Sequence, residues 1–271
     1  MIESHELKNR KRYLKKLIDF QDTEPVKVIT GIRRCGKSSL LKLMIRHLRE
    51  TGVQDEQIVE MNFGSHDFRN MTSDEVYQYV KGLVVPGKRM YLFLDELQRI
   101  NAWEDAVNSF RVDLDCDIYV TGSNAYLLSS EYSTYLSGRY VEIKMLPLSF
   151  REFLDFHNFE VRITSSALGG TRRQVFDKNG ERYDLREAFN AYMRFGGMPG
   201  IADVGLDQEK ALTLLDGIYS TVIVRDILER EKRCGQRQIT DSTLLRKIVL
   251  FLADNIGNSV SVSSIGNTLM N

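Results

Sequence analysis

The stretch "VKVITGIRRCGKSSLLKLMIRHL", residues 26–48, contains three local patterns in immediate succession. Its opening "VKVIT" is apolar or β-branched at nearly every position, which favours a buried strand. The residues after Lys37 place apolar side chains at helical spacing. Between these two patterns lies "GIRRCGKS", in which Gly31, Gly36, Lys37 and Ser38 occupy the fixed places of the pattern G-x-x-x-x-G-K-[ST]. The stretch therefore predicts a strand, a glycine loop that cradles phosphate, and a helix.

Each fixed position of this loop has a physical reason. Glycine tolerates positive φ, so the backbone can curl at both glycines until its N–H groups converge on phosphate oxygens. The following helix adds the positive end of its dipole. We expect Lys37 to bind the β and γ phosphates and Ser38 to coordinate Mg²⁺, with Ser39 beside it as a further binding residue. Arg34 has two interpretations, a direct phosphate contact or exposure at the tip of the loop.

Outward from this stretch, short apolar runs alternate with helical patterns. The apolar runs are nearly continuous and rich in β-branched and aromatic residues, as buried parallel strands are. They cover residues 26–30, 58–63, 90–95, 117–122 and 140–145, and the helical patterns cover residues 37–50, 73–84 and 101–113. The sequence therefore predicts an α/β fold in which a parallel sheet with right-handed crossovers has helices on both faces.

A pair of carboxylates follows the apolar run "MYLFL". Asp95 ends the predicted strand and Glu96 comes next, at the sheet edge where open α/β folds gather their ligands. We expect Asp95 to hold the Mg²⁺ shell and Glu96 to orient and polarise an attacking water. The alternative, two acidic residues that cap the next helix, explains the pair alone but not its place beside a phosphate loop.

Further polar groups follow the next two predicted strands and turns. In "VTGSN", either Ser123 or Asn124 could bind the γ-phosphate or the attacking water, although a plain turn explains these residues too. Arg139, in "SGRYVEI", precedes the last strand. An arginine that reaches the γ-phosphate, from the same chain or a neighbouring copy, raises hydrolysis by about 10³ to 10⁵. A structural salt bridge is the alternative for Arg139.

Composition argues against several classes of protein. The 37 basic and 37 acidic residues cancel, so no global charge favours nucleic acid or an anionic membrane. Three scattered cysteines and four separate histidines indicate neither a disulfide framework nor a zinc site. The N-terminus lacks the apolar core of a signal peptide, and no apolar run approaches the roughly 20 residues that span a bilayer. We therefore expect a cytoplasmic protein without a membrane partner.

Residues 7–18 predict a helix with one apolar face and many basic side chains, among them Arg10, Lys11 and Arg12. A solvated face on a packed helix is one interpretation of these charges. A contact with nucleic acid or phosphate is the other.

Together the quoted motifs resemble the AAA+ superfamily of P-loop ATPases, and within it the archaeal-type or STAND-like prokaryotic ATPases. The matching segments span about residues 25–200 and are "GIRRCGKSSLL", "YLFLDELQRINAWE", "YVTGSNAYLLS", "LSGRYVEIKMLPLSFREFL" and "RFGGMPG". The resemblance implies a P-loop NTPase fold with a five-stranded sheet of order 5-1-4-3-2, ATP and Mg²⁺ as cofactors, and a helical lid. It also implies that Gly197 and Pro199 form a lid element near the adenine, although a helix-breaking turn explains them equally. Arg194 and Arg225 are available as a lid arginine, but neither stands in a clear motif.

The expected domain organisation follows from the changes of pattern along the chain. We expect an N-terminal basic helix in residues 1–24, the nucleotide-binding domain in 25–160, a hairpin insertion or boundary in 161–183, a helical lid in 184–238, and the start of a truncated winged helix in 239–271. The hairpin is predicted around Asn179 and Gly180. Because members of the family continue beyond the winged helix, we expect a DNA or protein partner to bind through that further region, and a self-association to supply Arg139.

Three functions are compatible with these motifs. The first is slow, Mg²⁺-dependent hydrolysis of ATP. The second is a nucleotide-controlled switch or DNA-associated regulator in which hydrolysis is only a timer. The third, a small-molecule kinase, would need neither Glu96 beside Asp95 nor the polar groups after the later strands. The sequence favours the ATPase.

Overall fold

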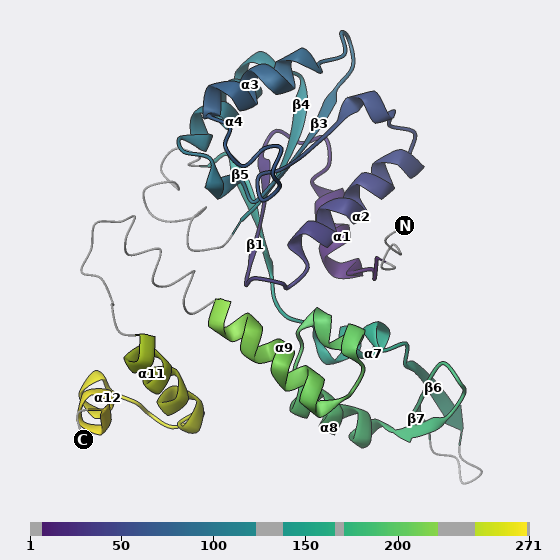
Figure 1. Ribbon diagram of the computed structural model, residues 1–271. Helices are drawn as coiled ribbons and strands as arrows, with labels where there is room; N and C mark the ends of the chain where they lie inside the picture. Colours follow the sequence, from purple (N-terminus) through teal and green to yellow (C-terminus); the bar gives the residue numbers. More distant parts are fainter. Residues whose placement is uncertain (1–6, 123–137, 166–170, 222–241, 270–271) are drawn as a thin grey trace. The chain divides into compact units, whose positions relative to one another are not determined.

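The computed structural model describes residues 7–122, 138–165, 171–221 and 242–269 (Figure 1). The chain forms two compact units, residues 1–208 and residues 209–271, and each is described by itself. The first unit contains α1 (Lys11–Asp19), β1 (Val26–Gly31), α2 (Lys37–Glu50), η1 (Asp55–Gln57), β2 (Ile58–Asn62), α3 (Ser73–Gly82), β3 (Met90–Asp95), η2 (Leu97–Arg99), α4 (Trp103–Asp113), β4 (Cys116–Thr121), β5 (Tyr140–Met145), α7 (Phe150–Phe156), β6 (Glu160–Ser165), β7 (Thr171–Phe176), β8 (Arg182–Asp184), α8 (Leu185–Phe195) and η3 (Pro199–Val204). The second contains α9 (Gln208–Thr221), which begins at the last residue of the first unit, α11 (Ser242–Asp254) and α12 (Val262–Leu269).

A five-stranded sheet forms the centre of the first unit. Its strand order is β2-β3-β4-β1-β5, and every neighbouring pair is parallel. Counted from the other side this order is 5-1-4-3-2, so the predicted α/β fold and strand order are confirmed. Because all five strands run the same way, their carboxyl ends lie together at one side of the sheet, which we call the carboxyl edge.

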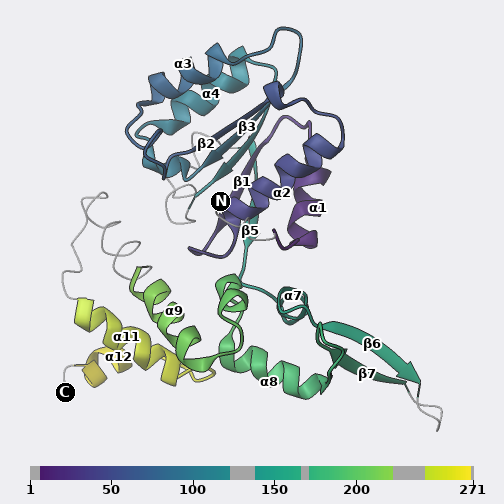
Figure 2. The ribbon, with the colours of Figure 1, turned by 45° about the vertical axis from the view of Figure 1, so that its right-hand side comes forward.

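Helices cover both faces of this sheet because alternate strand residues point to opposite sides. Figures 1 and 2 show α3 and α4 over one face and α1 and α2 over the other. The first face packs strand residues such as Val28, Met61, Leu92, Leu94 and Val120 against Val76, Val80, Val107 and Phe110. The second packs Ile29, Phe93, Tyr119, Ile143 and Met145 against Leu17, Leu40, Met44 and Leu48.

A buried polar network ties β1 to β4 on the face of α1 and α2. The side chains of Lys27 and Asp117 are both fully buried and form an ion pair. The second carboxylate oxygen of Asp117 accepts hydrogen bonds from the Tyr119 hydroxyl and the Asp22 N–H, each at 2.8 Å. Burial lowers the pKa of Lys27, which Asp117 opposes. The network therefore fixes the register of two strands that lead to the carboxyl edge.

An antiparallel sheet of order β6-β7-β8 follows α7 in the chain. The predicted hairpin is present between β7 and β8, where the Asp177 carboxylate accepts from the N–H groups of Asn179 and Glu181, and Gly180 takes a φ of 83°. Strand β6 was not predicted, although Val161 and Ile163 alternate with polar residues at the period of two of a strand, because the segment was interpreted as polar and turn-rich.

The division between the two units after residue 208 falls inside the segment 184–238 that we expect to be a lid. The domain boundaries therefore stay a prediction. Among the helices that the structure describes, none is both long and apolar enough to cross a bilayer.

Candidate functional site

The glycine loop between β1 and α2 has a backbone that other residues could not adopt at its two glycines. Gly31 has a φ of 148°, and a Cβ placed on it would lie 2.4 Å from the Met145 carbonyl oxygen. Gly36 has a φ of 101° in the left-handed region. The loop therefore packs its first glycine directly on the end of β5, and its second starts the helix.

Lys37 and the start of α2 provide the positive charge of this loop. The Lys37 side chain is buried, and its ammonium donates to the carbonyls of Gly31 at 3.0 Å and Ile32 at 3.2 Å. No side chain caps α2, whose N-cap is Gly36, and Ser38 and Ser39 are exposed in its first turn. An uncapped helix N-terminus beside a buried ammonium suits a polyphosphate, because both favour negative charge.

Asp95 lies two strands away from the loop, at the end of β3, and is held in place by its neighbours. It is 6% exposed, and one carboxylate oxygen accepts from the Thr121 hydroxyl at the end of β4. The other oxygen accepts from the Asn62 amide at the end of β2, at 3.3 Å. The ends of the neighbouring strands β2, β3 and β4 thus converge on one carboxylate.

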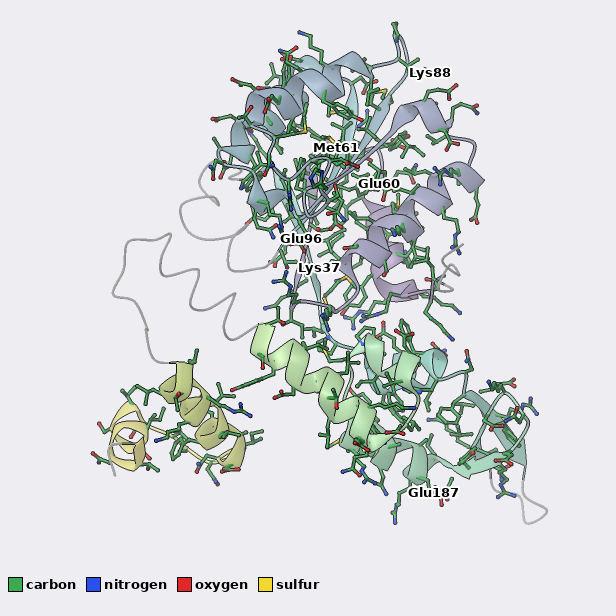
Figure 3. All side chains as sticks on the ribbon, viewed as in Figure 1. Lys37, Glu60, Met61, Lys88, Glu96 and Glu187 are labelled. Carbon is green, nitrogen blue, oxygen red and sulfur yellow. The ribbon has the colours of Figure 1, made fainter. Side chains whose placement is uncertain are left out.

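Glu96 follows in a conformation that is uncommon for glutamate. Its φ is 59° and its ψ is 36°, and its N–H donates to the Thr121 hydroxyl at 3.0 Å. The carboxylate accepts from the Gln98 amide at 2.8 Å and is 27% exposed. Figure 3 labels Glu96, which directly follows β3, and Lys37, which is the first residue of α2. The turn therefore directs Asp95 into the fold and leaves the Glu96 carboxylate accessible to solvent.

A cavity of about 400 Å³ opens beside the glycine loop. It is lined by Cys35, Gly36 and Ser39 of the loop and α2, by Leu7, Lys8 and Arg10 of the N-terminal segment, by Phe156 and Asn158, and by Pro199, Gly200, Ala202 and Asp203. The structure therefore brings Gly36, Ser39 and Pro199, which were singled out separately in the sequence, around one space. Its size and its mixture of apolar and polar walls suit a small organic ligand.

Gly197 does not line this cavity and has a packing role instead. A Cβ on Gly197 would lie 2.4 Å from the Leu148 carbonyl oxygen, and the Gly197 carbonyl accepts from the Leu148 N–H at 2.6 Å. Close approach of two backbones explains this glycine without any nucleotide. Its role near an adenine stays a prediction.

The structure places Arg139 far from the phosphate loop of its own chain. Arg139 is exposed, and its carbonyl accepts from the Val26 N–H at the start of β1. The loop begins at the other end of β1, five residues or about 17 Å away. A neighbouring copy is therefore the source that the hypothesis of a catalytic Arg139 requires.

The other predicted residues fall into two groups. Arg34 lies in the loop itself, where its side chain is exposed and its φ is 63°. Arg194 is exposed and contacts Gln208. Ser123, Asn124 and Arg225 lie outside the described residues. Their roles stay predictions.

Sequence reasoning missed two residues that organise the site. Asn62 lies inside the predicted strand 58–63 and is the last residue of the observed β2, and its polar side chain at a strand end was a signal of the same kind as Asp95. Arg10 was grouped with the basic residues of the first helix, but that grouping was wrong: Lys11 and Arg12 are exposed, whereas Arg10 is 3% exposed and contacts the loop. Nothing in the local sequence separates Arg10 from its neighbours.

Comparisons with known proteins agree with this geometry. Residues 23–154 match the family model of an AAA domain, and residues 186–270 match a domain of unknown function. An uncharacterized protein of Haemophilus influenzae is 36% identical over 263 residues, which are 96% of this chain and 59% of that protein. An uncharacterized protein of Methanocaldococcus jannaschii is 31% identical over 90% of this chain and 50% of its own length. The chain thus spans between half and three-fifths of the length of these relatives.

A solved structure has the same fold. The Walker-type ATPase PABY2304 of Pyrococcus abyssi superposes with a TM-score of 0.51, at 17% identity, over 97% of this chain and 88% of that one. At this identity the likeness bears on the fold alone.

Replacement of Thr121 by valine tests the cluster around Asp95. Thr121→Val removes the hydroxyl that joins Asp95 to the Glu96 N–H at nearly constant volume, so Asp95 loses its orientation. We expect the Mg²⁺ concentration that half-saturates nucleotide binding to rise about tenfold, measured by titrating Mg²⁺ at fixed ATP, while metal-free affinity is unchanged. The control is Thr30→Val, because the buried Thr30 hydroxyl bonds Glu142 and not a carboxylate of this site. Equal Mg²⁺ dependence in both variants would contradict the assignment.

Proposed function

We propose, from the premise that residues 23–154 form an AAA domain, that this chain binds Mg·ATP at the carboxyl edge of its sheet and hydrolyses it slowly. The observation that carries the proposal is the placement of Lys37 and the Asp95–Thr121 pair at the ends of β1, β3 and β4. The carboxyl edge of the sheet thus carries both an ammonium that can bind phosphate, from Lys37, and a fixed carboxylate that can bind a metal, from Asp95. Hydrolysis, its rate and its dependence on magnesium belong to the proposal.

The residues of the loop bind and orient the nucleotide. The Lys37 ammonium exchanges its two loop carbonyls for oxygens of the β and γ phosphates, and the first N–H groups of α2 complete the cradle. Ser38 and Asp95 supply the oxygen ligands that Mg²⁺ prefers. A magnesium ion held by these residues would supply positive charge that neutralises the phosphates. The 400 Å³ cavity with Pro199 receives the remainder of the nucleotide.

Glu96 is the residue that we assign to the attacking water. Its carboxylate is accessible, while its backbone is fixed by Thr121 and its side chain is contacted by Gln98. In that position it orients the water and accepts its proton as the bond from the water oxygen to the γ-phosphorus forms and the bond from the γ-phosphorus to the β-phosphate oxygen breaks, which releases ADP and phosphate. The kinase alternative gains no support, because a kinase has no need of a second carboxylate beside Asp95.

Arg139 is assigned to the site of a neighbouring copy. Arg139 is exposed and directly precedes β5, at the side of the sheet opposite the carboxyl edge. This placement supports an arginine that reaches the site of another chain over one that reaches the site of its own chain. An isolated chain would therefore lack the arginine that stabilises the charge of the transition state. Slow hydrolysis at low protein concentration follows from this arrangement.

A nucleotide-controlled switch is the second candidate. The contact that favours it is the backbone pairing of Gly197 with Leu148, which joins the segment after α8 to the chain that leaves β5. A change at the loop can reach η3, which follows Gly197 in the same unit, through this pairing. A DNA or protein partner, which the neutral charge of the chain does not identify, belongs to this second candidate only.

The variant Glu96→Gln tests the role that we assign to Glu96. Glutamine keeps the size and the hydrogen bond with Gln98 but cannot accept a proton, so we expect ATP affinity to stay within about twofold and the rate to fall by at least 10². Phosphate release measures the rate, and equilibrium titration with ATP measures the affinity. A Glu104→Gln variant is the matched control, because Glu104 is a buried carboxylate on α4. Wild-type hydrolysis by Glu96→Gln would remove Glu96 from this role.

Mixing two variants that are each impaired in hydrolysis tests whether Arg139 acts between chains. Arg139→Ala keeps an intact loop, and Lys37→Ala keeps an intact arginine, so a mixture contains pairs in which one chain completes the site of the other. We expect each variant alone to hydrolyse ATP slowly and an equal mixture at high concentration to regain a measurable part of the wild-type rate. No recovery under conditions in which the wild-type rate rises with protein concentration would rule out the assignment.

A further inference from the structure

Arg10 is a buried arginine in an otherwise exposed basic segment. Lys11 and Arg12, which follow it, are exposed, whereas Arg10 immediately before α1 is 3% exposed. A buried guanidinium needs partners for its donors, because burial without them is costly. The partners of Arg10 therefore indicate what this residue does.

All three nitrogens of the Arg10 guanidinium are engaged. Nε donates to Glu152 Oε1 at 2.7 Å, and Nη2 donates to Glu152 Oε2 at 3.2 Å, so the pair is bidentate. Nη1 donates to the Cys35 carbonyl at 3.2 Å, and Nη2 also donates to the Leu146 carbonyl at 3.0 Å. The ring of Tyr13 covers the guanidinium at 4.7 Å. One side chain thus joins the phosphate loop, the end of β5 and α7.

The contact with Cys35 determines the direction of an N–H group in the loop. The Cys35 carbonyl and the Gly36 N–H belong to the same trans peptide, in which the two groups point in opposite directions. Holding the carbonyl toward Arg10 therefore turns the Gly36 N–H away from it. This N–H lies at the N-cap of α2, where phosphate-binding loops present their donors.

The contact with Leu146 holds the same loop at its beginning. Gly31, where the loop starts, packs against the backbone of Met145, the residue before Leu146. The Leu146 N–H is bonded to the Tyr13 hydroxyl at 3.1 Å, so both backbone groups of Leu146 are fixed by the N-terminal segment. Arg10 thereby connects the support of the first glycine to the peptide of the second.

Glu152 is itself fixed and charged. Its Oε2 accepts from the Ser149 N–H at 3.0 Å and the Ser149 hydroxyl at 2.9 Å in a capping box at the start of α7. Burial alone would raise the pKa of Glu152, but the hydrogen bonds from Arg10 and Ser149 lower it below its ordinary value. Glu152 is therefore a carboxylate at neutral pH and a firm anchor for the guanidinium.

We propose that Arg10 is a positioning residue of the nucleotide site: Glu152 holds its guanidinium, and the guanidinium orients the Cys35–Gly36 peptide so that the Gly36 N–H faces the phosphate. This inference rests on the proposed function in one respect, that the loop binds a nucleotide. Arg10 acts through the backbone of the loop, so it affects ground state and transition state alike. Its loss should raise KM and Kd and leave kcat nearly unchanged.

The test is a double-mutant cycle on nucleotide affinity with Arg10→Gln, Glu152→Gln and the double variant, using Mg·ATP and Mg·ADP in equilibrium titrations. We expect Arg10→Gln to weaken both nucleotides about tenfold, since one charge-assisted hydrogen bond is lost at the loop. Glu152→Gln should weaken them less, and adding it to Arg10→Gln should cost nothing further, because Glu152 acts only through Arg10. Arg10→Lys should recover part of the affinity and serves as the folded variant if Arg10→Gln is unstable.

The matched control is Arg12→Gln, which removes an exposed positive charge two residues away. Thermal unfolding of every variant is measured beside affinity, because a purely structural role would lower stability and leave the Kd of the folded protein unchanged. That result, or additive effects of Arg10 and Glu152 on Kd, would overturn the proposal. If the wild-type chain bound no nucleotide at all, the proposed function would fail instead, and the two failures are thus distinguishable.

Discussion

The close approach of Gly31 to the Met145 carbonyl is the constraint on which the site depends. It exists because β1 pairs in parallel with β5 up to their last residues, Gly31 against Met145. Any side chain at this point would push the loop off the sheet. With the loop seated there, Lys37 is buried under it, and α2 begins with free N–H groups at the carboxyl edge.

The remaining parts of the site are placed by the same parallel arrangement. Strand β4 lies between β1 and β3, and its last residue, Thr121, bonds both Asp95 and the Glu96 N–H. The buried Lys27–Asp117 pair joins β1 to β4 on the opposite half of the strands. The distance between the phosphate loop and the carboxylates is therefore set by strand pairing.

Local periodicity and the glycine motif were sufficient to predict the parallel sheet and the glycine loop, whereas the strand order came from the resemblance to the AAA+ superfamily. The sequence was not sufficient where long-range packing decides a role. Arg10 and Arg12 look alike in the sequence, yet only tertiary contacts bury one and expose the other. Strand β6 needed β7 as a partner, and Gly197 needed the Leu148 backbone, before either could be explained.

The central claim is that this edge of the sheet binds Mg·ATP through Lys37, and titration calorimetry of Mg·ATP tests it most directly. The account predicts saturable one-to-one binding to the wild-type chain, with affinity at least about tenfold weaker in Lys37→Ala, because an ammonium that contacts phosphate is lost. Equal affinity of the two proteins, with both shown to be folded by circular dichroism, would contradict it.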